Sequence, residues 1–180
     1  MSIRERFARF INDVVTGDKK GRIVGTPIGF IIFVGLLTLF IFIGVWIDGW
    51  LGIPKIVDLW RFIVSAIMFI GGFLLAGLTV IQFIKTRGTP VPINPPPKLI
   101  ITGLYAYIRN PMALGVFLIL EGIGFLLGSL SVIIIFAPLP VLLYVLFIKT
   151  VEERELEMRF GQQYLDYKQR VPMFLPRLKK

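Results

Sequence analysis

The chain has 180 residues, 56% of them hydrophobic, and its mean hydropathy of +0.80 is higher than a soluble domain of this size shows. It contains no cysteine and no histidine, which excludes disulfides, thiol nucleophiles, histidine general bases and Cys/His zinc sites. We interpret the formal net charge of +9 as topogenic and facing anionic lipid, and we expect no nucleic-acid partner.

An amphipathic helix is predicted at the start of the chain. Apolar residues recur at helical spacing from Ile3 to Val15, while charged residues occupy the other side from Arg4 to Asp13. This pattern is typical of a helix that lies flat in the membrane interface. We interpret it as an anchor rather than as a site.

Uncharged runs then predict four transmembrane helices, because a helix needs about 20 residues to cross the hydrocarbon core. The first run covers residues 28–47 and the second covers residues 62–84. From residue 112 to residue 148 the only charged residue is Glu121, and this run is too long for one helix. It suits a hairpin of two helices, the third and fourth spans.

The turn of this hairpin is predicted near Gly128, Ser129 and Ser131, which are residues that favour a tight connection. Pro138 and Pro140 fall inside the fourth span. A proline within a helix removes a backbone hydrogen bond, so we expect these two residues to kink the span and to free carbonyl groups.

Basic residues predict the orientation of the chain. They gather before the first span, between the second and third spans, and after the fourth, whereas the loop after the first span holds only Lys55, with Arg61 at the start of the second. The positive-inside rule then places both termini and the loop between spans two and three in the cytoplasm. An outer aromatic belt is formed by Trp46, Trp50 and Trp60.

Three cytoplasmic segments remain for chemistry, and the first is the proline-rich linker over residues 87–99. Its composition rules out regular secondary structure and favours an extended, polyproline-like strap. The linker is either a stiff spacer or a lid over a site.

The second segment is the turn GLYAYIRNP, which begins at Gly103 and leads into the third span. Gly103 permits an unusual backbone angle, and Tyr105 and Tyr107 offer aromatic faces and hydroxyl groups to a ligand. Pro111 suits the first position of a helix, and the free N–H groups behind it attract an anion. The alternative is an interfacial anchor made of tyrosine and arginine.

The third segment is the tail after the fourth span, where acidic residues cluster at Glu152, Glu153, Glu155 and Glu157. These residues either form i,i+4 pairs with neighbouring cations on a solvated helix or hold a cationic ligand. Gly161 is expected to end this helix, and Tyr164 and Tyr167 lie one turn apart on the next segment.

Turn and tail together resemble the integral-membrane methyltransferases typified by isoprenylcysteine carboxyl methyltransferase, which are related to phospholipid N-methyltransferases. The matching stretches are TGLYAYIRNP, EERELEMRFG and QQYLDYKQRVP, and the resemblance covers about residues 98–176. Taken with the spans predicted above, it implies an all-α integral membrane enzyme with four spans, an N-terminal interfacial helix and a cytoplasmic helical tail that closes a cofactor pocket. We expect residues 1–97 to contain the interfacial helix, the first two spans and the proline-rich linker, and residues 98–180 to form the methyltransferase core.

The resemblance implies S-adenosylmethionine as cofactor, with the product S-adenosylhomocysteine. The residues that it assigns to cofactor binding are Lys98, Leu99, Ile100, Gly103, Tyr105, Asn110, Pro111, Met112 and Glu152. The chain departs from the family pattern at Asn110, where many members have histidine, and at Ala113, where tyrosine is usual.

The implied reaction is an in-line displacement at the sulfonium methyl group, for which a protein mainly supplies positioning and a dry, suitably charged pocket. The absence of histidine favours a carboxylate acceptor, as in an isoprenylcysteine-like substrate, since a carboxylate is already nucleophilic at pH 7. Arg109, Lys149 or Arg170 would orient that anion. A phospholipid amine is the alternative acceptor.

Other interpretations stay open at this point. Glu121 lies inside a span, so it is a candidate for substrate contact, although it is equally explained as a protonated or locally satisfied side chain. A non-catalytic membrane scaffold or lipid-binding protein derived from the family is the rival function. A homo-oligomer is also possible, because small residues at positions 71, 72, 76 and 77 form a face suited to close helix packing.

Overall fold

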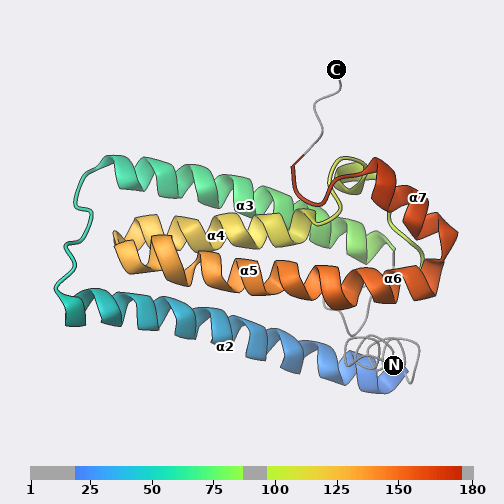
Figure 1. Ribbon diagram of the computed structural model, residues 1–180, viewed down its shortest axis with the longest axis horizontal. Helices are drawn as coiled ribbons and strands as arrows, with labels where there is room; N and C mark the ends of the chain where they lie inside the picture. Colours follow the sequence, from blue (N-terminus) through green and yellow to red (C-terminus); the bar gives the residue numbers. More distant parts are fainter. Residues whose placement is uncertain (1–18, 87–96, 176–180) are drawn as a thin grey trace.

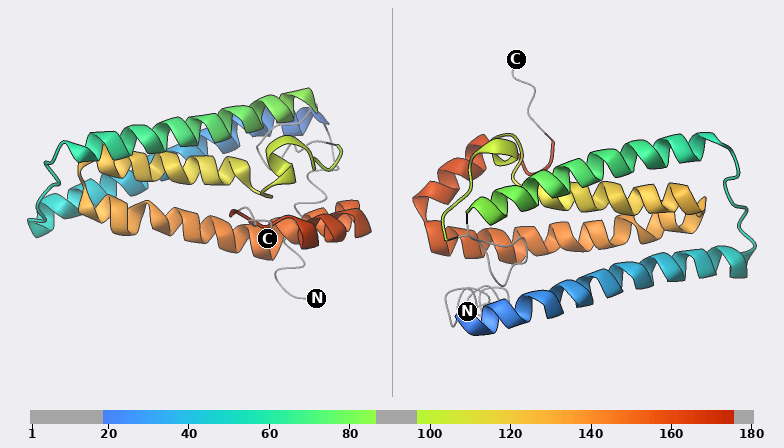
Figure 2. Two further views of the ribbon diagram at one scale, coloured as in Figure 1. Left: turned by 90° about the horizontal axis from the view of Figure 1, so that it is seen from above. Right: turned by 180° about the vertical axis from the view of Figure 1, so that it is seen from behind.

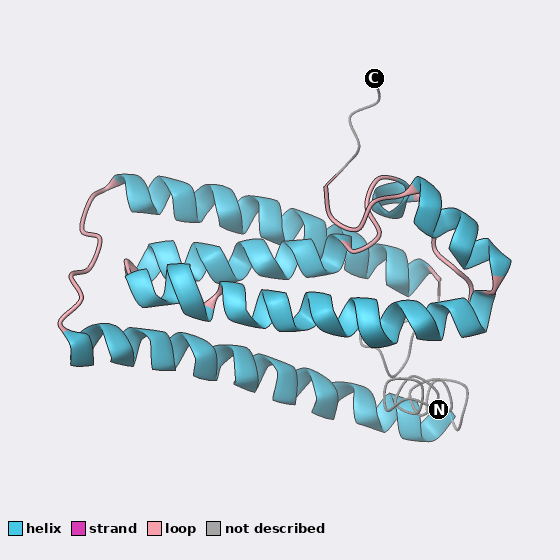
Figure 3. Cartoon of the chain, viewed as in Figure 1, coloured by secondary structure: helices cyan, strands magenta, loops and turns pink. Residues whose placement is uncertain are grey.

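A computed structural model of the chain describes residues 19–86 and 97–175. Every regular element in these two stretches is helical, which confirms the predicted all-α class there (Figure 3). The elements are α2 (Lys19–Leu51), α3 (Trp60–Lys85), η1 (Gly103–Ala106), α4 (Pro111–Leu127), η2 (Val132–Phe136), α5 (Pro138–Phe147), η3 (Ile148–Glu152), α6 (Glu153–Phe160) and α7 (Gln162–Arg170). The predicted N-terminal amphipathic helix and most of the proline-rich linker lie outside the described residues.

Three helical stretches are long and apolar enough to cross a membrane: Pro27–Leu51, Trp60–Lys85 and Val132–Phe160. The chain is therefore an integral membrane protein. The helix α4 is apolar but has only 17 residues, so it is shorter than the others. The four-span topology stays a prediction for this reason.

The four longest helical stretches run alongside one another, as Figures 1 and 2 show. The connection from α2 to α3 and the reversal between α4 and α5 lie at one end of the bundle. The turn η1 and the helices α6 and α7 gather at the opposite end. Three segments that are far apart in the sequence thus meet at this second end.

Close packing between α3 and α4 depends on small residues. A Cβ atom on Gly72 would come within 2.7 Å of the carbonyl oxygen of Gly115, and one on Gly115 would come within 2.9 Å of the backbone nitrogen of Ala76. The hydroxyl of Ser65 donates a hydrogen bond across the same seam to the carbonyl of Gly122 at 2.8 Å. Gly72 and Ala76 therefore pack against α4 of the same chain. A homo-oligomer stays a prediction.

At the end where α2 turns into α3, a buried carboxylate joins α2 to the connection between α4 and α5. Asp48 is 2% exposed and accepts hydrogen bonds from the hydroxyl of Ser129 and, at 3.1 Å, from the backbone N–H of Ser131. The π-helical turn η2 follows, and Pro138 stands at the first position of α5, where its missing N–H is not needed. The irregular turn lies directly before Pro138, which has no N–H to donate to the carbonyl four residues earlier. The kink itself stays a prediction.

Candidate functional site

The turn at Gly103 is fixed against the last turns of α3. Gly103 has a φ of +61°, the left-handed conformation that glycine adopts without strain, in agreement with the sequence. The side-chain amide of Gln82 donates to the carbonyl of Thr102 at 2.6 Å. The rings of Phe83 and Tyr105 meet edge to face, with centroids 6.0 Å apart. The aromatic face of the turn is therefore held in one place.

The tail wraps the same turn from the other side. The hydroxyl of Tyr167 donates to the carbonyl of Tyr105 at 2.7 Å. The backbone N–H groups of Arg109 and Asn110 donate to the carbonyls of residues 172 and 173 at 2.9 and 3.1 Å. Gly161, with a φ of +53°, separates α6 from α7 as predicted and lets the chain fold back. An apolar cluster beneath these bonds is formed by Tyr164, Tyr167 and Val171 against Leu99, Leu156 and Phe160.

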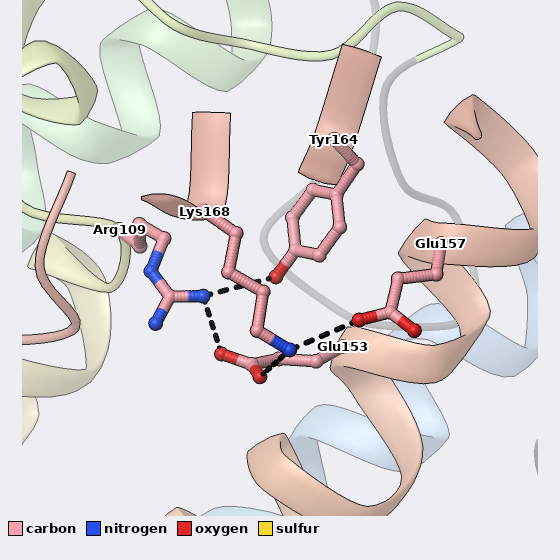
Figure 4. A network of polar contacts seen from close by, with 5 residues as sticks. All are labelled: Arg109, Glu153, Glu157, Tyr164 and Lys168. Atoms are coloured by element: carbon pink, nitrogen blue, oxygen red, sulfur yellow. Dashed lines mark hydrogen bonds and ion pairs between the residues drawn. The ribbon is translucent and has the colours of Figure 1, made fainter. Parts of the chain in front are cut away.

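Glu153 is the centre of an ion-pair network, shown in Figure 4. One carboxylate oxygen accepts a hydrogen bond from Arg109 at 2.5 Å, and the other lies 2.7 Å from the ammonium of Lys168. Lys168 also donates to Glu157 at 2.9 Å, and Arg109 donates to the hydroxyl of Tyr164 at 3.3 Å. The network links the turn, α6 and α7.

The acidic cluster is thus not a solvated helix face, because Glu153 and Glu155 are 5% and 4% exposed. An i,i+4 pair does join Glu155 to Arg159 at 3.2 Å. The alternative that all these residues sit in water with local partners is wrong, since two of them are buried and Glu153 is paired with Lys168 of α7.

Glu152 is the last residue of the π-helical turn η3, one residue before this network. Its Oε2 atom is buried and has no hydrogen-bond partner among the residues that the structure describes. Tyr105 of the turn and Tyr144 of α5 lie close to the carboxylate. A buried carboxylate oxygen without a partner is costly, so this atom is suited to a ligand that brings a donor or a positive charge.

The tyrosines around the turn are neutral hydrogen-bond donors. Burial raises the pKa of Tyr105 well above its ordinary value, and the charge of Glu152 adds to this effect. Burial likewise raises the pKa of Tyr164 and of Tyr167, although Arg109 opposes the rise at both. The site therefore combines aromatic faces and neutral hydroxyl groups with one carboxylate.

The predicted cofactor residues before the turn occupy different positions. Lys98 is exposed, Leu99 packs against the cluster under α7, and Ile100 is buried. A side chain must reach the apolar cluster under α7, or the protein surface beside that cluster, to contact a ligand bound at this end. These three residues lead directly into the turn at Gly103, at the same end of the bundle as Glu152.

At the start of α4, Pro111 takes the first helical position, as predicted. Asn110 is the residue before it, and its side chain makes no capping hydrogen bond to the helix. The first N–H groups of a helix have no partner within the helix, so those behind Pro111 are free of that side chain. Met112 is half-buried beside them, and Ala113 is buried.

The three cations expected to orient an anionic acceptor differ in their surroundings. Arg109 is committed to Glu153 and Tyr164. Lys149 and Arg170 are exposed, and Arg170 donates to a carbonyl of its own helix at 3.1 Å. Glu121 is half-buried on α4, about 15 Å along the helix axis from its start.

Sequence reasoning did not single out three residues that shape this end. Tyr144 and Gln82 are polar side chains in otherwise apolar runs, and that contrast was a usable signal. Glu153 was seen only as part of the acidic cluster. Its long-range pairs with Arg109 and Lys168 leave no mark in the local pattern, because the partners lie 44 and 15 residues away.

Comparison with known families gives one finding. The model of a family described as PEMT, phospholipid methyltransferase, matches residues 60–163, more than half of the 180 residues. The match includes α3, the turn, α4, α5, η3, α6 and the first residues of α7. No match was found among curated proteins or among solved structures.

Proposed function

The chain belongs to the phospholipid methyltransferase family, and we propose that it transfers a methyl group from S-adenosylmethionine to a lipophilic acceptor held in the membrane. The observation that carries this proposal is the buried, unpartnered Oε2 atom of Glu152 at the junction of turn and tail. A cationic or hydroxyl-rich ligand would satisfy that atom. S-adenosylmethionine offers both kinds of group, and when bound it supplies an electrophilic methyl group on a sulfonium.

The residues at this end fit such a ligand. Glu152 is suited to the cofactor's amine or ribose hydroxyls, and Tyr105 offers an aromatic face held by α3 and α7. The N–H groups at the start of α4, which Asn110 leaves uncapped, are suited to the cofactor's carboxylate. We propose that Lys98, Leu99, Ile100, Gly103, Pro111 and Met112 complete the binding surface.

What the protein contributes to the reaction is positioning and exclusion of water. Tyr164 and Tyr167 of α7 are buried against the turn and the tail, and the Oε2 atom of Glu152 is buried as well, so we expect a ligand beside them to be desolvated. The site needs no strong base for a carboxylate acceptor, whose anion is nucleophilic at pH 7. This is the acceptor that the sequence favours, as in an isoprenylcysteine-like substrate.

A second acceptor, the amine of a phospholipid, is favoured by one observation. Arg109, at the end of the turn, has its charge paired with Glu153, which weakens its attraction for an acceptor carboxylate. The site then has one unpaired carboxylate and several neutral phenols, surroundings that suit an amine better than an anion. Methyl transfer to isoprenylcysteine analogues and to phosphatidylethanolamine, measured side by side with labelled cofactor, separates the two acceptors.

The first experiment is calorimetric binding of S-adenosylmethionine and S-adenosylhomocysteine to the detergent-purified protein. Saturable binding that Glu152→Ala weakens, and that Asp166→Ala leaves unchanged, would support the cofactor site. Asp166 is a matched control because it is an exposed carboxylate on α7. No binding by a folded wild-type protein would instead favour a non-catalytic membrane scaffold.

We also propose that the chain crosses the membrane four times, with both termini and the site in the cytoplasm. Since the chain has no cysteine, single cysteines can be introduced without background. Cysteines at Asp58 and Asp166, both exposed and at opposite ends of the bundle, should react with an impermeant reagent from opposite sides. Reaction of both from one side would contradict this topology.

A further inference from the structure

Both carboxylate oxygens of Glu153 are used to hold the tail. Its Oε1 lies 2.5 Å from the guanidinium of Arg109 in the turn, and its Oε2 lies 2.7 Å from the ammonium of Lys168 in α7. The side chains of Glu153 and Arg109 are only 7% and 11% exposed, so the pair between them is shielded from solvent. Since both oxygens of Glu153 are paired within the chain, its side chain links the turn, α6 and α7 rather than binding a ligand.

The same network is balanced in charge. Arg109 and Lys168 contribute two positive charges, and Glu153 and Glu157 contribute two negative ones. Farther along α6, Arg159 is paired with Glu155 at 3.2 Å. The carboxylate of Glu152 belongs to none of these ion pairs, so it is available to a cationic ligand.

Glu152 and Glu153 are neighbours that face different surroundings. Successive side chains of a helix point about 100° apart. Glu153 faces Arg109 and Lys168, whereas Glu152 faces Tyr105 and Tyr144. The π-helical turn η3 ends at Glu152, and such turns shift the register between the helices on either side. The direction of the Glu152 side chain thus depends on how α6 is held.

We propose that Glu153 is a positioning residue for the cofactor site. By binding Arg109 and Lys168 it fixes α6 and the turn η3, and it thereby directs the Glu152 carboxylate toward Tyr105. Glu153 acts through its neighbour and does not touch the cofactor. This inference rests on the proposed function, because it assigns the Glu152 carboxylate to cofactor binding.

The test compares Glu153→Gln with Glu157→Gln. The two variants are isosteric, remove the same charge and share the partner Lys168, but only Glu153 also holds Arg109. We expect Glu153→Gln to weaken the affinity for S-adenosylhomocysteine at least tenfold in calorimetry and to raise KM for the methyl donor. Glu157→Gln should stay within twofold of the wild type. Wild-type affinity of Glu153→Gln, or equal losses in both variants, would overturn the proposal.

Hydrogen exchange on the same proteins gives a readout that does not need the cofactor. Glu153→Gln should speed exchange of the backbone amides of η3 and α7, whereas Glu157→Gln should leave η3 as it is. If the wild type failed to bind S-adenosylhomocysteine, the proposed function would fall, yet this comparison would still decide whether Glu153 holds the turn. Unchanged exchange in η3 would overturn the inference by itself.

Lys168 offers a milder variant if Glu153→Gln does not fold. Its side chain is 35% exposed, so Lys168→Gln removes one partner of Glu153 with less disturbance of buried groups. We expect a threefold or larger loss of affinity for S-adenosylhomocysteine, and recovery to near wild-type affinity in Lys168→Arg, which keeps the charge. Full affinity of Lys168→Gln, or an equal loss of affinity in Lys168→Gln and Lys168→Arg, would count against the network.

Discussion

Each end of the bundle buries a carboxylate, and the two carboxylates differ in what surrounds them. At the end where α2 turns into α3, Asp48 receives a hydrogen bond on each oxygen, from Ser129 and from Ser131. At the other end, Glu152 has a buried oxygen without a partner in the described part of the chain. The first arrangement satisfies its charge with neutral donors of the same protein. The second leaves a group that a ligand can satisfy.

The difference teaches that burial of a charged group does not by itself mark a functional site. Asp48 is the more deeply buried residue, yet its bonds join α2 to the connection between α4 and α5 and leave nothing to bind. Glu152 stands beside a network whose charges already balance. A candidate site is distinguished from a structural contact by the hydrogen-bonding capacity that the chain leaves unsatisfied, more than by burial.

The largest expected effect comes from removing the charge of Glu152. We expect Glu152→Gln to reduce the affinity for S-adenosylhomocysteine at least about 100-fold, the effect of losing a desolvated charged contact. The free energy of unfolding should not fall, because the variant removes an uncompensated buried charge. Calorimetry and thermal unfolding in detergent measure the two quantities. A stability loss with full affinity would reverse the assignment.

Asp48→Ala should have the opposite outcome. The hydroxyl of Ser129 and the N–H of Ser131 lose their charged acceptor, so we expect the free energy of unfolding to fall by about 2 kcal/mol. The affinity for S-adenosylhomocysteine should stay unchanged, since the residue lies at the far end of the bundle. Asp58→Ala is the control, because Asp58 is exposed and near the same end.

A smaller effect is expected from loosening the tail. Tyr167→Phe removes the hydrogen bond to the carbonyl of Tyr105 and should cost about 1 kcal/mol of stability. It should also weaken cofactor affinity severalfold, because the turn at Tyr105 loses this hydrogen bond to α7. Tyr107→Phe serves as the matched control, since Tyr107 is 68% exposed. Equal effects from both variants would argue against a clamp.

The smallest effect is expected from alkaline pH. Burial raises the pKa of Tyr105, Tyr164 and Tyr167 in the folded protein above about 10, the value of an unfolded chain. Folding stability should therefore be unaffected by these groups below pH 10 and should fall as the pH rises through that value. Ultraviolet absorbance of tyrosinate should show these phenols ionising only as the protein unfolds. Titration of all tyrosines near pH 10 in the folded protein would contradict the burial.

Much of the membrane architecture was predictable, because it follows from composition. The first two apolar runs and the helix break at Gly161 appear in the structure close to the predicted positions. The π-helical turns before Pro138 and at Glu152 were not predicted, since a shift in helical register depends on packing against α2 and on the pairs of α6. The packing of Gly72 and Ala76 against α4 was not predictable for a similar reason: a small-residue face indicates close packing but does not identify the helix that fills it.

The sequence by itself determined the class of protein, the apolar segments and the candidate residues of turn and tail. These features depend on hydrophobicity and on residue type, which are local properties of the chain. Only the tertiary structure decided which acidic residues are buried, that Arg109 is paired with Glu153 and that the Glu152 carboxylate keeps an unpartnered oxygen among the described residues. Each of these facts depends on residues that approach one another across the fold, and the energy of a charge is set by those distant neighbours.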